Sequence, residues 1–354
     1  MNRALWSSGI LFLACATAYS PVPTPQPPPK LPEAPTGFDK LTNGRVTQEE
    51  HDADRAQFEE DAVLPALGPA YNARSCANCH ETPVTGGSSQ VTEVRTPAGV
   101  VRDRAVQAEF QEHVAPGTPA GQRISTSLLG LGLVEDIPDD QLRALARSNG
   151  GQVVEVPVLE TPGARRVGRF GWKCQHGSLL SFAGEAEFVE KGVTNRLFSG
   201  GRKPPFEDLD EDGSEDIDAY ARFMRATKAP SRAANAGSDQ VRAGERIFLS
   251  IGCGTCHVPT LFTAKEVFHP YGDFLLHDVG TGDAITVGPA PTNKFRTAAL
   301  WGLRARLRLL HDGRALNAVT AVQAHHVEAE ESRERWNGLS DQDRAAVLAF
   351  LASL

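Results

Sequence analysis

The chain has 354 residues, of which 40% are hydrophobic, and this length suits two domains of ordinary size. It carries 36 lysines and arginines against 44 aspartates and glutamates, which gives a net charge of −8. We therefore expect no nucleic-acid partner, because phosphate binding needs a basic patch and the sequence shows none. Six cysteines are also too few for a secreted scaffold held together by disulfides.

Residues 1–18 have the pattern of an export signal, with Arg3 before an apolar run and small residues after it. The run is too short to span a bilayer as a mature helix. Two cleavage sites stay open: "FLAC" is similar to a lipobox with Cys15 as the lipidated residue, although Phe12 stands where leucine is usual, and "ACA" or "ATA" would release the chain. We expect a periplasmic protein, or a lipoprotein anchored in the outer membrane and facing the periplasm, that meets a membrane only through its lipid.

Proline and small residues mark the expected linkers. Residues 19–37 are rich in proline, which fixes φ and lacks an N–H, so they predict an extended polyproline II spacer, with a disordered tail as the alternative. Globular sequence begins near Phe38, and "TKAPSRAANAGSD" has the composition of an inter-domain linker. We therefore expect an N-terminal domain at 38–235 and a C-terminal domain at 236–354.

The predicted elements are mainly helical. The first helix follows Thr47, a suitable N-cap, in "RVTQEEHDADRAQFEEDAVL". Residues 152–159, "QVVEVPVL", are the best strand candidate, and a helix is expected over Leu179–Lys191 with Gly192 as its C-terminal stop. Because alternating runs are few, the sequence predicts a mainly α fold with long loops and little β-structure.

The acidic stretch "EDLDEDGSEDID" is similar to the start of a calcium loop. Counted from Asp208, however, the twelfth position is Ala219, where a bidentate glutamate is needed, so calcium is unsupported and we expect a solvated turn. A short amphipathic helix is expected next, in "QVRAGERIFLSIGCGTCH". Near the end of the chain, Ser340 and Asp343 have capping-box spacing before an apolar helical face.

Two short segments carry the chemistry: "SCANCH" at 75–80 and "GCGTCH" at 252–257. CxxCH in an exported protein is the attachment site of c-type haem. Two thiols on one turn can reach both vinyl groups on one edge of the porphyrin, and the histidine that follows, His80 or His257, points its ring at the iron. A zinc site would need further Cys or His pairs, and a thioredoxin-like motif sits in a βαβ pattern that is not seen here. The predicted attachment thiols of the two covalent haems are Cys76, Cys79, Cys253 and Cys256.

Each haem iron also has a sixth position, for which methionine is the common choice at high potential. The chain contains only Met1 and Met224, and Met224 is expected in the core. A histidine or an open site must therefore serve at least one iron. The eight remaining histidines are His51, His113, His176, His269, His277, His311, His325 and His326.

Several long blocks, in order over residues 60–354, resemble the bacterial di-haem oxidoreductases, a family also described as peroxidases or, loosely, as thiol oxidoreductases. They include "LGPAYNARSCANCHETPVTGGSS", "GRFGWKCQHGSLLSF", "YGDFLLHDVG" and "KFRTAALWGLRARLRLLHDGRALNAVTAVQAHH". More distantly, the chain is similar to the di-haem cytochrome c peroxidases and their MauG-type relatives. The resemblance implies two cytochrome-c-like domains, with an electron-receiving haem on His257 and a reactive haem on His80.

The resemblance also implies roles by position. Trp172, in "GWK", matches a tryptophan that lies between the haems and relays electrons, with a core aromatic as the alternative. Glu190, or Glu187, falls near an acidic residue that could exchange protons with peroxide. Phe182 stands near a position where the peroxidases have glutamine, a departure that puts peroxide chemistry in doubt.

In the C-terminal part, "HHVEA" stands where the family usually has "HGGEA". We expect His325 to be the distal ligand of the second haem, with His326, His277 and His311 behind it. His311 and Arg314 lie together in "LLHDGR", in a block that lines the second haem pocket in the family. An arginine there could pair with a haem propionate.

Three functions remain open on this basis. The first is a peroxidase-like oxidoreductase, which takes electrons from a small redox protein or a quinol-linked donor and reduces a peroxide-like small molecule at the His80 haem. The second is an electron carrier without substrate turnover, whose two irons are both six-coordinate. The third is a haem oxygenase that acts on an organic substrate and needs an apolar channel to the His80 haem. The resemblance favours the first.

Overall fold

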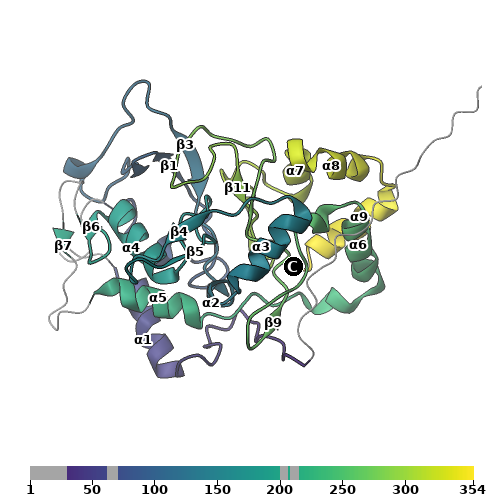
Figure 1. Ribbon diagram of the computed structural model, residues 1–354, viewed down its shortest axis with the longest axis horizontal. Helices are drawn as coiled ribbons and strands as arrows, with labels where there is room; N and C mark the ends of the chain where they lie inside the picture. Colours follow the sequence, from purple (N-terminus) through teal and green to yellow (C-terminus); the bar gives the residue numbers. More distant parts are fainter. Residues whose placement is uncertain (1–29, 62–70, 200–205, 208–214) are drawn as a thin grey trace, which may run out of the picture.

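The computed structural model describes residues 30–61, 71–199, 206–207 and 215–354 (Figure 1). The predicted export signal and the start of the proline-rich segment lie outside the described residues, as does most of the acidic stretch that resembles a calcium loop. Among the described residues, no helix is both long and apolar enough to cross a membrane.

The prediction of a mainly α fold is confirmed. The helices are α1 (Gln48–Glu59), α2 (Leu131–Glu135), α3 (Asp139–Asn149), α4 (Leu179–Ala186), α5 (Asp216–Ala226), α6 (Asp239–Ser250), α7 (Ala318–Gln323), α8 (Glu330–Asn337) and α9 (Asp341–Leu351). The strands are β1 (Thr92–Thr96), β2 (Gly99–Val100), β3 (Gly121–Ile124), β4 (Glu155–Pro157), β5 (Arg165–Val167), β6 (Val193–Thr194), β7 (Phe206–Glu207), β8 (Leu261–Phe262), β9 (Val267–Phe268), β10 (Leu276–His277) and β11 (Phe295–Arg296). They pair into small sheets, the widest of which has the order β2-β1-β3.

Local signals set several helix ends as expected. Thr47 and Glu50 form a capping box at the start of α1, in which each residue's side chain accepts a hydrogen bond from the other's backbone N–H. Ser340 caps α9 by accepting from the backbone N–H of Asp343 at 3.1 Å. The helix predicted to stop at Gly192 does so, because that glycine has φ +78, although its last turn, after α4, widens into a π-helical turn.

The strand predicted over residues 152–159 is shorter than expected. Only Glu155–Pro157, the strand β4, pairs with β5, in antiparallel register. Gln152 forms a bridge with Leu276 in a different part of the chain. The start of this apolar run therefore pairs with a distant segment of the chain and not with β5.

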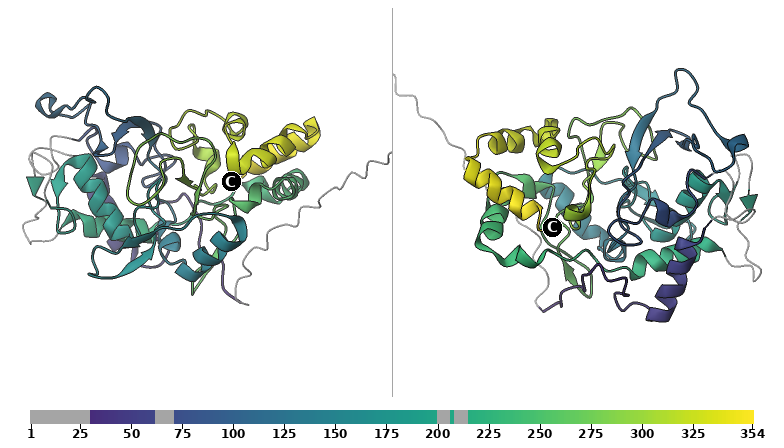
Figure 2. Two further views of the ribbon diagram at one scale, coloured as in Figure 1. Left: turned by 45° about the horizontal axis from the view of Figure 1, so that its top comes forward. Right: turned by 180° about the vertical axis from the view of Figure 1, so that it is seen from behind.

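The helices gather in two groups along the long axis of the molecule (Figure 1). The group of α1, α4 and α5 surrounds the larger hydrophobic core, and the group of α6 and α9 surrounds a smaller core that includes Tyr271 and Trp336 (Figure 2). In the second group Gly244 allows α6 to touch α9, since a Cβ there would lie 1.9 Å from the Ala346 carbonyl oxygen. Each group borders one of the cavities described below.

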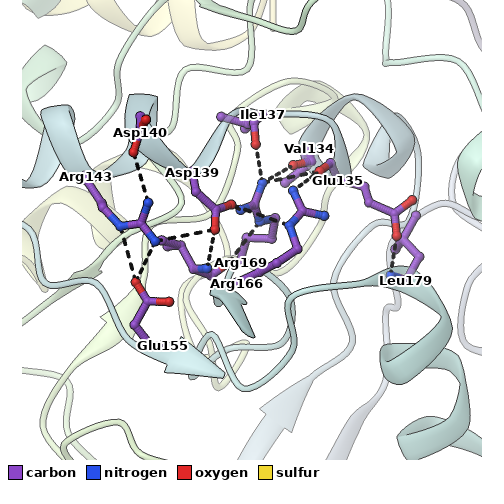
Figure 3. Close-up of polar contacts among 11 residues, drawn as sticks. Val134, Glu135, Ile137, Asp139, Asp140, Arg143, Glu155, Arg166, Arg169 and Leu179 are labelled. Carbon is purple, nitrogen blue, oxygen red and sulfur yellow. Dashed lines mark hydrogen bonds and ion pairs between the residues drawn. The ribbon is translucent and has the colours of Figure 1, made fainter. Parts of the chain in front are cut away.

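A polar cluster between the two groups fixes the loop that follows β5 (Figure 3). Arg169 is fully buried, and its Nη1 donates to the Ile137 carbonyl at 2.6 Å and, at 3.3 Å, to those of Val134 and Glu135. Its other terminal nitrogen pairs with Asp139 at the start of α3. Because a buried guanidinium is costly unless its donors are satisfied, this network holds the loop against the turn between α2 and α3.

Candidate functional site

The two CxxCH segments adopt the same local structure. Cys76 and Cys253 each begin a single 3₁₀ turn. The backbone N–H of His80 then donates to the Cys76 carbonyl at 3.1 Å, and that of His257 donates to the Cys253 carbonyl at 3.0 Å. Both segments therefore present two thiols and an imidazole on one turn of chain, the arrangement that a c-type haem needs.

Both histidines are also oriented in the same way. The Nδ1 of His80 donates to the Gly87 carbonyl at 3.3 Å, and the Nδ1 of His257 donates to the Tyr271 carbonyl at 3.0 Å. Burial lowers the pKa of each imidazole to about 4, so each ring is neutral at neutral pH. A neutral ring whose Nδ1 carries the proton leaves Nε2 free to bind iron.

A first cavity opens beside His80. It encloses about 1140 Å³ of empty space, open solvent included. Its lining includes Cys76, and aromatic side chains from several elements, Phe58 of α1 and Phe182 of α4 among them. Met224, which is buried in the core as predicted, also borders this cavity.

Carboxylates set the electrostatics of the first cavity. Glu190 lines it, half-buried, and no hydrogen bond joins its side chain to another described residue. Burial raises the pKa of Glu190 to about 7, with Glu93 and Glu185 adding to the shift and Arg95 opposing it. The predicted alternative, Glu187, is instead held by Lys191 at 3.3 Å and by other partners. Glu190 is thus the carboxyl group poised to exchange protons near neutral pH.

The first cavity is also lined by Gln175 and Glu185, which the sequence did not single out. Gln175 donates from Nε2 to Glu185 at 3.0 Å, and the Nε2 of His176 lies 2.9 Å from the same carboxylate oxygen. Burial alone would raise the pKa of Glu185, but His176, Arg95 and Gln175 lower it to about 2. Gln175 and His176 both follow Trp172 closely in the block "WKCQHGS", and this proximity is the sequence feature that could have identified them as site residues. Phe182, near the position where the peroxidases have glutamine, stacks on Phe170 with ring centroids 6.0 Å apart.

A second cavity opens beside His257 and encloses about 2150 Å³ of empty space, open solvent included. Both attachment thiols, Cys253 and Cys256, line it. His325 lines it too, and its Nδ1 donates to the Ala321 carbonyl at 2.7 Å, which again leaves Nε2 free. The structure therefore brings His325 into the cavity of His257, in the tautomer that a distal iron ligand needs.

Two other histidines near the second cavity, His277 and His326, pair with carboxylates. His277 is buried between Asp273, 2.9 Å from its Nε2, and Glu328, 2.8 Å from its Nδ1. Burial would lower the pKa of His277, but Asp273 and Cys256 raise it to about 11. His326 is exposed and lies 3.1 Å from Glu330.

His311 and Arg314, predicted to bind the second haem together, are separated by the structure. His311 is buried, lines the second cavity and stacks on Phe295 with ring centroids 3.8 Å apart. Burial lowers the pKa of His311 to about 3, helped by nearby cations such as Arg123. Arg314 is exposed, pairs with Asp312 at 3.4 Å and does not border the cavity.

Trp172 lines both cavities. Its indole N–H donates to the Ile124 carbonyl at 2.7 Å, and its own carbonyl accepts from the backbone N–H of Arg296 at 2.8 Å. Ser125 and Thr126 are also shared between the two linings. A single aromatic side chain thus lies between the two candidate sites, where the sequence placed it.

The residues present fit a c-type haem at each site. The five described cysteines form no disulfide with one another, so the four motif thiols are free to add to vinyl groups. Cys76, Cys253 and Cys256 each line a cavity that also holds a neutral imidazole and is lined largely by apolar side chains. Among the residues described, no group of three or more His, Cys, Asp or Glu side chains could hold a bare metal ion.

Comparisons with known proteins bear on the C-terminal part of the chain. Residues 207–354 match the family described as "Di-haem oxidoreductase, putative peroxidase". No curated protein matches the chain.

Solved structures resemble the whole chain more weakly. A structure of Kuenenia stuttgartiensis hydrazine synthase under 20 bar xenon has 16% sequence identity and a TM-score of 0.49, with all of both chains covered. A MauG-like protein associated with microbial copper homeostasis has 14% identity and a TM-score of 0.44, covering 92% of this chain and 93% of its own. The family match agrees with the resemblance carried by the sequence blocks: over residues 207–354 this chain is similar to the di-haem oxidoreductases.

Proposed function

We propose that this protein is a peroxidase-like oxidoreductase with two covalently bound haems, of which the one on His80 is the reactive site. One observation carries the assignment: the second cavity pairs His257 with a second free imidazole, His325, whereas His80 is the one histidine among the described residues that line the first cavity. The first cavity has instead Glu190, a carboxyl group whose pKa lies near 7. A closed site suits electron transfer, and an open site with a proton-exchanging group suits substrate chemistry.

The motif residues would hold the haems. At each site two cysteine thiols would add across the two vinyl groups of a haem, each addition exchanging a vinyl double bond and an S–H bond for a carbon–sulfur and a carbon–hydrogen bond. His80 and His257 would bind the irons through Nε2. When bound, haem iron supplies the redox chemistry that this chain's side chains lack.

Glu190 would carry the protons of peroxide reduction. As a carboxylate it would accept a proton from a peroxide in the first cavity, and as an acid it would return that proton to the leaving oxygen. Overall, one peroxide takes up two electrons and two protons, its O–O bond breaks, and two waters form. The electrons come from a donor of the small redox protein or quinol-linked class.

Trp172 would serve as the relay between the sites, since it borders both cavities and its backbone and side chain are both hydrogen-bonded. An aromatic ring fixed in this way needs no rearrangement to accept and pass on an electron. The N-terminal and C-terminal groups of helices, each beside one cavity, support the proposal of two cytochrome-c-like domains at 38–235 and 236–354. Export to the periplasm, with or without a lipid on Cys15, is proposed from the sequence alone.

A pure electron carrier is the second candidate, because Met224 borders the first cavity and a thioether is a common sixth ligand. Electron paramagnetic resonance of the ferric holo-protein separates the two. We expect one high-spin and one low-spin signal, together with turnover of hydrogen peroxide when a reduced donor is supplied. Two low-spin signals and no peroxide turnover would overturn the peroxidase proposal.

A further inference from the structure

We propose that Arg296 and Arg306 bind the two propionate groups of the second haem and thereby turn its carboxylate edge toward Trp172. The proposal rests on the haem binding proposed above for His257. Both arginines line the second cavity together with Trp172. The sequence had assigned this kind of contact to Arg314, which the structure leaves outside the lining.

The two guanidinium groups have donors to spare. Arg296 is buried, and its Nε donates to the Gly171 carbonyl at 2.8 Å. Arg306 is half-buried, and its Nη2 donates to the Trp301 carbonyl at 2.7 Å. No hydrogen bond joins the remaining guanidinium nitrogens of either side chain to another residue that the structure describes. Each arginine therefore keeps several N–H groups for an acceptor that the protein does not supply.

The carboxylates near the two arginines already pair with other side chains. Glu328 is bound by His277 and by Lys294, and Glu331 is paired with Arg335. Asp273 acts on Arg296 through space, but its oxygens accept from His277, Asn149 and the Leu275 N–H. Within the described residues, neither Arg296 nor Arg306 forms an ion pair.

Because Arg296 and Arg306 place two positive charges in one cavity without an ion-pair partner among the described residues, a ligand with two negative charges would match them. Burial and, to a smaller extent, repulsion from Arg296 lower the pKa of Arg306 to about 10, so the pair is costly as it stands. Haem carries two carboxylates on the edge opposite its vinyl groups. With the vinyl edge attached to Cys253 and Cys256, the propionate edge is the part of the ligand that matches this charge, and each arginine can hold one carboxylate in a forked contact.

This orientation has a consequence for electron flow. The Arg296 guanidinium carbon lies 6.0 Å from the centre of the Trp172 ring, so a propionate on Arg296 would lie beside the relay residue. The edge held by the cysteines would then be the edge farther from Trp172. Arg296 thus serves as a positioning residue for the haem as well as a counter-charge.

The test is a potentiometric titration of the low-spin haem in Arg296→Gln, Arg306→Gln and the matched control Arg314→Gln, which removes an exposed arginine that does not line the cavity. Haem content is measured first, since a chain without its second haem refutes the function proposed above rather than the clamp. We expect each inner variant to shift the reduction equilibrium at least tenfold toward the ferric form, about 59 mV for one electron. The control is expected to keep the wild-type potential.

Equal potentials in all three variants and the wild type, with both haems present, would overturn the proposal. Should Arg296→Gln and Arg306→Gln fail to fold, the pH dependence of the wild-type midpoint potential tests the proposal. Clamped propionates stay ionised, so the midpoint potential of the low-spin haem should be constant between about pH 5 and 8. A propionate that titrates in that range would contradict the clamp.

Discussion

The two cavities are built around the same short motif but face their histidines with different chemistry. Beside His257 the protein places a second neutral imidazole, His325, and two arginines, Arg296 and Arg306, that form no ion pair with a described residue. Beside His80 it places carboxyl groups and an amide, with Glu190 near its titration point. The CxxCH motif thus specifies how a haem would be attached. The side chains that other elements bring to each cavity would decide whether its iron transfers electrons or reacts with a substrate.

The largest expected effect comes from removing one pair of thiols. The double variant Cys76→Ala, Cys79→Ala should keep one covalent haem where the wild type has two, as measured by the pyridine haemochrome spectrum, and should lose the high-spin signal. The variant Cys174→Ala serves as the control, because this buried thiol lies 3.4 Å from the Phe274 carbonyl and outside both motifs. Two haems retained in the double variant would contradict the attachment proposed here.

Replacing the second imidazole should make the two sites alike. In His325→Ala the low-spin signal of the second haem should convert to high-spin, because the distal ligand is lost. The matched control is His326→Ala, whose exposed ring pairs with Glu330 and does not line the cavity. An unchanged low-spin spectrum in His325→Ala would refute His325 as the ligand.

Removing the proton-exchanging group should affect only the first site. Glu190→Gln is expected to lower the rate of peroxide turnover about 10²- to 10⁴-fold while the low-spin signal is unchanged. Since the carboxylate form accepts the proton and the pKa is raised to about 7 by burial, Glu93 and Glu185, against Arg95, the wild-type rate should rise as the pH increases through 7. The exposed Glu49→Gln provides the control, and equal rates in both variants would exclude the role.

The smallest effects compare the helices that support each cavity. Thr47 caps α1, which carries Phe58 to the first cavity, and Ser340 caps α9, which carries Leu351 to the second. Thr47→Ala and Ser340→Ala should each lower the free energy of unfolding by about 1 kcal/mol in urea titrations, because a helix donor loses its partner. Thr118→Ala, at an exposed side chain, should change it by less than about 0.5 kcal/mol. A capped variant no less stable than this control would show that its cap contributes nothing.

Some of this could be predicted without any coordinates. The helix caps, the stop at Gly192 and the turn of each CxxCH motif depend on residues within a few positions of one another, so local chemistry determines them. The extent of β4 could not be predicted, since Leu276 competes for Gln152 from far along the chain. The same holds for Gln175 and Glu185, because their contact depends on how the loop after β5 lies against α4.

The sequence by itself predicted the chemistry of attachment at His80 and His257, and its resemblance to the family implied Trp172 as the aromatic residue between them. Only the tertiary structure decided which side chains face each histidine: it brought His325, Arg296 and Arg306 into the second cavity and left Arg314 at the surface. The reason is physical. Motif spacing acts through one turn of chain, whereas burial, charge pairing and the choice of cavity depend on contacts between residues that are distant in the sequence.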